Sequence, residues 1–187
     1  MDYKSVADFI DEILRRKDPY NHHGANVATI CLQMVSLMDV KFNEHELEML
    51  KLGARMHDLG KIFMDDGILN SHGRLTGSQY AAVQTHVTQG FRLALSMSFD
   101  PIICSIIRYH HENFEGSGYP DGLKGDAIPF FARMVRVADT YDALTSSRAY
   151  RRNSSPADAL KVIEAESERC FDPIIVDLLK RILPQHA

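Results

Sequence analysis

Hydrophobic residues recur at helical spacing along nearly the whole chain. The periodicity predicts an all-α fold of about eight helices, which begin near Ser5, Asn21, Asn43, Ser78, Asp100, Pro129, Ser155 and Asp172. Ser5 with Asp8 and Asn43 with Glu46 have the spacing of capping boxes, and Gly60 is the expected end of the third helix. No run alternates convincingly between hydrophobic and polar residues, so strands should be few or absent.

Two segments interrupt this pattern, at residues 62–77 and 113–128. The second is rich in glycine and forms the one conspicuous long loop. Structureless stretches of this length are uncommon in compact domains, so its length indicates a function. Its glycines can also serve simply to permit turns. For Gly118, Tyr119 and Pro120 we favour a functional interpretation, because they closely follow a pair of histidines.

Composition and charge narrow the class of protein. The 187 residues, 45% of them hydrophobic, suit one globular domain spanning residues 1–187. The net charge of -4 argues against a protein that binds long nucleic acids. Three cysteines far apart indicate neither a disulfide framework nor a zinc site, but a reducing compartment. No apolar run is long enough for a membrane span and the start is unlike a signal peptide, so we expect a cytoplasmic protein.

Four histidines and two aspartates fall on the inward faces of predicted helices. They are His57, His86, His110, His111, Asp139 and Asp142. A single histidine on an apolar face is more often a hydrogen-bonded core residue than a metal ligand. Six ionisable residues pointing into one small domain are costly unless they are paired or bound to metal. One shared metal site explains all of them together, which favours that interpretation.

The adjacent pair His57 and Asp58 suggests how such a site is built. At a helix terminus both side chains can reach one cavity, and the two oxygens of a carboxylate can bridge two cations. Imidazole and carboxylate ligands together suit Fe, Mn, Zn or Ni and argue against Ca or Mg. Two such ions would stabilise a phosphoryl displacement by a water that they make acidic. Lys61, about one turn later, could contact a phosphate oxygen or that water, although a lone lysine is more often a solvated surface residue.

The same residues carry a family resemblance. Residues 57–61 (HDLGK) resemble the HDxGK signature of the HD-domain phosphohydrolases. Residues 110–112 (HHE) with 116–125 (GSGYPDGLKG) are similar to the extended motif of the HD-GYP subfamily. Two further matches follow in the right order, at residues 137–148 (VADTYDALTSSR) and 171–173 (FDP). The resemblance extends over nearly the whole chain.

The resemblance implies a helical bundle around a metal centre, often of iron, that hydrolyses cyclic di-GMP to pGpG or GMP. It implies one metal held by His23, His57, Asp58 and Asp139, and a second held by Asp58, His86, His110 and His111. Asp58 would bridge the two ions, and Asp58 and Lys61 would be the catalytic residues. The implied substrate-binding residues are Lys61, Gly118, Tyr119, Pro120, Asp142, Arg148 and Arg151.

The start of the second helix departs from the family pattern. His22 and His23 are rivals for one ligand position, and alignment on Val27 favours His23. Family members with three metals commonly carry a glutamate four residues earlier, where this chain has Pro19. We therefore expect two divalent ions, Fe or Mn before Ni or Zn, and no third.

Two other functions fit the same residues. The substrate could be another cyclic dinucleotide, such as cyclic GMP-AMP, or a different phosphorylated nucleotide. Alternatively, the chain could be a non-catalytic receptor, or an interaction module that binds a signalling domain through the 113–128 loop. Receptors that have lost activity typically lack ligands. Here all seven positions of a two-metal site are filled, which favours catalysis.

Overall fold

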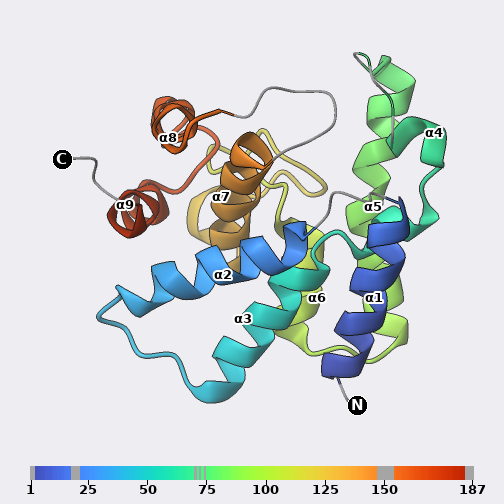
Figure 1. Ribbon diagram of the computed structural model, residues 1–187, viewed down its shortest axis with the longest axis horizontal. Coiled ribbons are helices and arrows are strands. Elements are labelled where there is room, and N and C mark those ends of the chain that lie inside the picture. The colour runs from blue at the N-terminus through green and yellow to red at the C-terminus, as the bar shows by residue number, and fades with distance from the viewer. Residues whose placement is uncertain are drawn as a thin grey trace.

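A computed structural model shows an all-helical fold (Figure 1). It describes residues 3–17, 22–69, 71, 73, 75–146 and 154–183. Within these ranges the α-helices are α1 (Tyr3–Lys17), α2 (His23–Ser36), α3 (Glu44–Met56), α4 (Asp66–Leu69), α5 (Gly77–Ser96), α6 (Pro101–Tyr109), α7 (Phe130–Thr145), α8 (Pro156–Ala165) and α9 (Pro173–Ile182). Two 3-10 helices, η1 (Leu59–Phe63) and η2 (Gly125–Ala127), complete the described elements, which include no strand. The predicted fold class is confirmed.

The helices pack around two hydrophobic clusters. In one, α2 and α7 pack with α8, α9 and part of α3. In the other, α1 and η1 pack with α5, α6 and the opposite side of α3. In Figure 1 the first group lies to the left and the second to the right, with α3 between them. None of the described helices is both long and apolar enough to cross a bilayer.

Local capping signals explain most helix starts. Asn43 and Glu46 form the predicted capping box of α3, each side chain bonding to the other residue's backbone N–H. Asp100, Ser155 and Asp172 cap α6, α8 and α9, each followed by proline at the first helical position. These predictions are confirmed because the signals act within one helical turn.

Three predicted boundaries are wrong. Helix α1 already includes Tyr3, so Ser5 lies inside it and does not cap it. Helix α5 is capped by Thr76 with Gln79 and begins before Ser78. Gly60 does not end α3, which stops at Met56; it lies within η1 instead. A Cβ atom on Gly60 would lie 1.9 Å from the backbone oxygen of His86, so glycine permits η1 to contact α5.

Candidate metal centre

Five helical segments bring the predicted ligands together. The end of α3 and the turn into η1 supply His57 and Asp58, and the middle of α5 supplies His86. The end of α6 supplies His110 and His111. The remaining two, His23 and Asp139, come from the first turn of α2 and from α7. Because α3 lies between the two hydrophobic clusters, its end reaches residues from both groups of helices.

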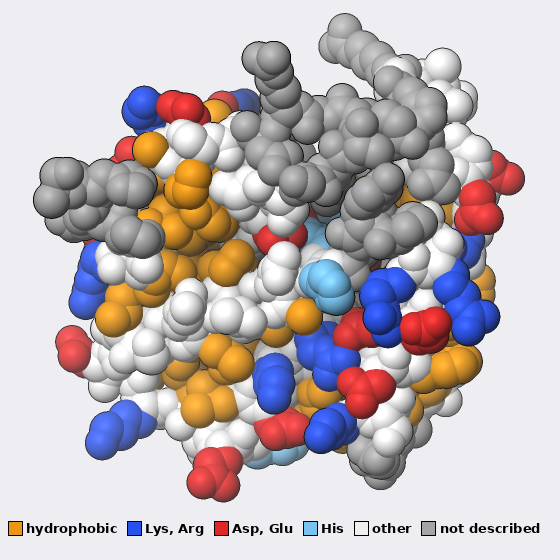
Figure 2. Space-filling model, in the orientation of Figure 1, with side chains coloured by type: hydrophobic (Ala, Val, Ile, Leu, Met, Phe, Trp, Pro, Cys, Tyr) orange, Lys and Arg blue, Asp and Glu red, His pale blue; other side chains and the backbone are white. Residues whose placement is uncertain are grey.

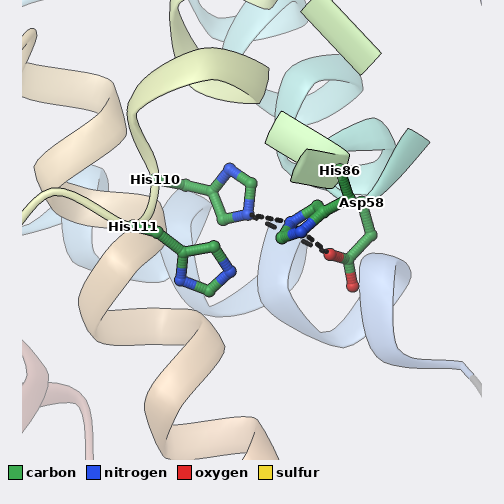
Figure 3. Close-up of side chains that lie close together, drawn as sticks. All are labelled: Asp58, His86, His110 and His111. Atoms are coloured by element: carbon green, nitrogen blue, oxygen red, sulfur yellow. Dashed lines mark hydrogen bonds and ion pairs between the residues drawn. The ribbon is translucent and has the colours of Figure 1, made fainter. Parts of the chain in front are cut away.

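One group of side chains lies on the α5 and α6 side of Asp58 (Figure 3). Asp58, His86, His110 and His111 each offer one ligand atom, and these atoms lie within 4.8 Å of one another. The Nε2 atom of His86 is 3.4 Å from Oδ1 of Asp58 and 3.4 Å from Nε2 of His110. We call these four residues the second cluster.

The other group lies on the α2 and α7 side. His23, His57 and Asp139 also offer ligand atoms within 4.8 Å of one another, and we call them the first cluster. The Nε2 atom of His23 lies 2.9 Å from Oδ1 of Asp139. Oδ2 of Asp58 lies 3.3 Å from Nε2 of His57. The two oxygens of Asp58 therefore face different clusters, as a bridging carboxylate requires.

The hydrogen bonds around these side chains suit a metal ion. The Nδ1 atoms of His57 and His86 lie 2.7 Å from the backbone oxygens of Ala54 and Val83. Such bonds fix the proton on Nδ1 and leave the Nε2 lone pair free to bind a cation. Nε2 of His57 and Oδ1 of Asp58 are buried without a hydrogen-bond partner. Because unsatisfied buried atoms are costly, this donor set fits a metal centre.

Burial and charge favour the ligand form of these groups. Burial holds the pKa of His110 well below its usual value, and the neighbouring histidines add to the effect. Burial opposes ionisation of Asp58, but Lys61 and His57 outweigh it and hold the pKa of Asp58 well below its usual range. Metal ions bind neutral imidazole and ionised carboxylate. The surroundings of these two residues therefore favour the state that binds a metal ion.

The structure distinguishes His23 from His22. His23 is 7% exposed and belongs to the first cluster, whereas His22 is exposed at the start of α2. A cavity of about 230 Å³ lies beside them and is lined by His22, His23, His57 and Asp58 together with residues of α1. Figure 2 shows exposed histidine atoms near the middle of the view, with basic and acidic side chains beside them. The cavity gives the first cluster an opening towards solvent.

Asp142, which the resemblance places among the substrate-binding residues, lies next to His23. It is 5% exposed, and its Oδ2 lies 2.6 Å from Nδ1 of His23. Its Oδ1 accepts hydrogen bonds from Asn26 and Ser146. Both oxygens are therefore engaged behind His23. We propose that Asp142 orients this imidazole and does not contact substrate.

Replacing Asp142 with asparagine should weaken metal binding. The amide group would point a donor at Asn26 or at His23, and loss of such an outer partner typically costs about 10- to 100-fold in metal affinity. Titration of the metal-free protein with Mn²⁺ at pH 9, where the proton on His23 competes least with the ion, measures the change. Asp177→Asn, at an exposed position on α9, is the matched control and should bind as the wild type does. Unchanged affinity in Asp142→Asn would contradict the orienting role.

The other predicted substrate-binding residues divide into three groups. The ammonium of Lys61 contacts Oδ2 of Asp58, and its side chain is 26% exposed. The ring of Tyr119 stacks on His111, with Pro120 next in the chain and Gly118 packed against Asn113. Arg148 and Arg151 lie outside the described residues. Glu112 was missed by the sequence analysis as a site residue, although it directly follows the two histidines and is 2% exposed.

Residues 9–175 match the family model described as the HD domain. The chain belongs to the HD-domain family. This HD-domain chain is 40% identical over 141 residues to the cyclic di-GMP phosphodiesterase response regulator RpfG of Xanthomonas campestris pv. campestris, covering 74% of the chain and 37% of that protein. It is 34% identical over 177 residues to the 3'3'-cGAMP-specific phosphodiesterase 2 of Vibrio cholerae, covering 93% of the chain and 33% of that relative. The predicted resemblance to HD-GYP phosphodiesterases is confirmed.

The HD-domain chain spans roughly a third of the length of these two relatives. Among solved structures it is similar to Bd1817, an HDG"Y"P protein from Bdellovibrio bacteriovorus, with a TM-score of 0.70 and 22% identity. That match covers 87% of this chain and 52% of the Bd1817 chain. At this identity the likeness supports the fold alone.

Proposed function

We propose that the chain is a metal-dependent phosphodiesterase that hydrolyses a cyclic dinucleotide, with cyclic di-GMP as the first candidate. The observation that carries the proposal is the position of Asp58, whose two oxygens face two clusters of buried histidines. A receptor that only bound a dinucleotide would have no need of so many costly buried ligands. Similarity to two cyclic dinucleotide phosphodiesterases supports the same class of reaction, phosphodiester hydrolysis.

The proposed centre holds two divalent ions, Fe or Mn by preference. His23, His57, Asp58 and Asp139 would hold one; Asp58, His86, His110 and His111 would hold the other. Bound there, the ions would neutralise charge on a phosphate and make a water acidic enough to attack it. We propose that residues 1–187 form one domain and that no third ion binds, because proline replaces the glutamate common in three-metal members.

The proposed substrate-binding roles rest on distance from the metal centre and on charge. The ammonium of Lys61 already lies against Asp58, close enough to the centre to hydrogen-bond a phosphate oxygen of a bound substrate. Arg148 and Arg151, which match basic positions of the family, would bind phosphates or a guanine base. Tyr119 borders the second cluster through its stacking on His111 and would line the substrate cleft.

A substrate panel tests the proposal. Protein expressed anaerobically with iron, or loaded with Mn²⁺, is assayed with cyclic di-GMP, cyclic GMP-AMP and a phosphomonoester. We expect hydrolysis of a cyclic dinucleotide, with cyclic di-GMP fastest. The second candidate substrate is cyclic GMP-AMP, because the cGAMP-specific phosphodiesterase 2 of Vibrio cholerae matches 93% of this chain. Tight binding without turnover of either dinucleotide would sink the enzyme proposal and favour a receptor.

A further inference from the structure

Glu112 is a buried carboxylate immediately after the two histidines of the second cluster. Its Oε1 accepts hydrogen bonds from the backbone N–H groups of Asp121 and Gly122, at 2.8 and 3.1 Å. Its Oε2 accepts one from the N–H of Leu123, at 3.1 Å. One side chain thereby holds three successive residues of the 113–128 loop.

The same loop contacts the ligand His111. The backbone N–H of Tyr119 donates to the backbone oxygen of His111 at 3.2 Å. The two rings stack, with centroids 5.0 Å apart and an angle of 27° between planes. A Cβ atom on Gly118 would lie 2.2 Å from the backbone nitrogen of Asn113, so the loop folds back closely on its own start. The position of Tyr119 over His111 therefore depends on how the loop is held.

Other contacts hold the start of the loop and the side chain of Asp121, while Glu112 holds the backbone of residues 121–123. Arg108 forms an ion pair with Asp121 at the surface, and Arg136 donates to Asn113 at the start of the loop. The N–H groups of Phe114 and Glu115 donate to the backbone oxygens of residues 170 and 169. Glu112, the residue directly after the ligand pair, bonds to the N–H groups of residues 121–123.

The chemistry of the contact requires a carboxylate. Three N–H groups pointing into a buried space need acceptors, and both oxygens of an ionised carboxylate can accept. A glutamine of the same size has one acceptor oxygen, and its NH₂ group would face an N–H donor. An apolar side chain would leave all three donors unsatisfied, which is costly in a buried position.

We propose that Glu112 is a positioning residue that locks the 113–128 loop onto the second cluster, so that Tyr119 covers His111 and borders the substrate cleft. This role rests on the proposed function, since it acts on the binding of the dinucleotide. Glu112 itself contacts neither the ligand atoms of the cluster nor substrate. Its loss should therefore loosen the loop and weaken substrate binding while the metal ions stay in place.

The test compares Glu112→Gln with Glu115→Gln, which makes the same chemical change at an exposed position of the same loop. In Glu112→Gln we expect faster amide hydrogen exchange at residues 121–123 and a KM for cyclic di-GMP raised about tenfold, as expected for losing hydrogen bonds to a charged group. The kcat should change less than KM, and the content of bound Mn²⁺ should equal that of the wild type. Glu115→Gln should match the wild type in all four measurements.

Each contrary outcome is distinct. Unchanged amide exchange at residues 121–123 would show that Glu112 does not hold the loop. Faster exchange with unchanged KM, or loss of Mn²⁺ from Glu112→Gln, would overturn the positioning role. A wild type that hydrolyses no cyclic dinucleotide would instead defeat the proposed function. The exchange measurement would still test the anchor, because it requires no turnover.

Discussion

Asp58→Ala should lose both metal ions and lower kcat/KM for the cyclic dinucleotide by at least about 10³-fold, equivalent to about 4 kcal/mol of transition-state stabilisation. The reason is geometric. Oδ1 of Asp58 lies 3.4 Å from His86 in the second cluster, and Oδ2 lies 3.3 Å from His57 in the first. Removing this one side chain would thus take a ligand from both proposed ion sites at once. Loss of one histidine ligand, by contrast, should weaken the binding of chiefly one ion.

Metal analysis and steady-state kinetics measure this effect together. Asp58→Asn separates charge from shape, because it keeps the size of the side chain but removes the negative charge and one acceptor oxygen. It should bind metal more weakly than the wild type and keep the fold. Glu48→Gln, at an exposed position of α3, is the matched control and should retain metal and activity. If Asp58→Ala retains both ions, the bridging assignment is wrong.

Local signals predicted the helices well because they act within a turn. Asn43 and Glu46 satisfy each other's backbone N–H groups without help from elsewhere in the chain. Gly60 was misjudged because its surroundings require glycine for a reason that the local sequence does not show. The backbone of His86, on α5, leaves no room there for a side chain. Ser5 was misjudged for a different reason: α1 extends back at least to Tyr3, so the helix begins before the residue that the pattern selected.

The same distinction holds in the candidate site. Helical register could predict His57, His86 and His110, because each continues an apolar stripe. His23 is the first residue of α2, so no preceding turn reveals its direction, and only the family resemblance selected it. Asp142 lies one turn after Asp139, but register does not reveal that its carboxylate bonds to His23. Glu112 bonds to loop backbone, a partner that side-chain patterns do not reveal.

The two clusters differ in how they hold protons when no metal is bound. Burial lowers the pKa of His86, and holds those of His110 and His111 well below their usual value. Burial also lowers the pKa of His23, but hydrogen bonds to Asp139 and Asp142 outweigh it and raise that pKa to about 9. At neutral pH the second cluster is therefore ready to bind a cation. The first cluster must first release a proton from His23.

Binding of Mn²⁺ to the first cluster should consequently strengthen about tenfold for each unit of pH between 7 and 9, while binding to the second changes little. Titration of chelator-treated protein with Mn²⁺ at pH 7, 8 and 9 should resolve one pH-dependent site and one nearly constant site. In Asp142→Asn the pH dependence should weaken, since one of the two bonds that raise the pKa of His23 is altered. Asp177→Asn should retain it.

The stability of the metal-free protein should move in the opposite direction. The folded pKa of His23, about 9, lies above its ordinary value of 6.5, so its ion pairs stabilise the fold fully below pH 6.5. That contribution is lost as pH rises towards 9, and the Tm in the presence of a chelator should fall over this range. With saturating Mn²⁺ the fall should disappear, because a cation held by the first cluster would replace the proton on His23. Two sites with the same pH dependence, or a metal-free Tm that rises from pH 7 to 9, would show that the clusters do not differ in this way.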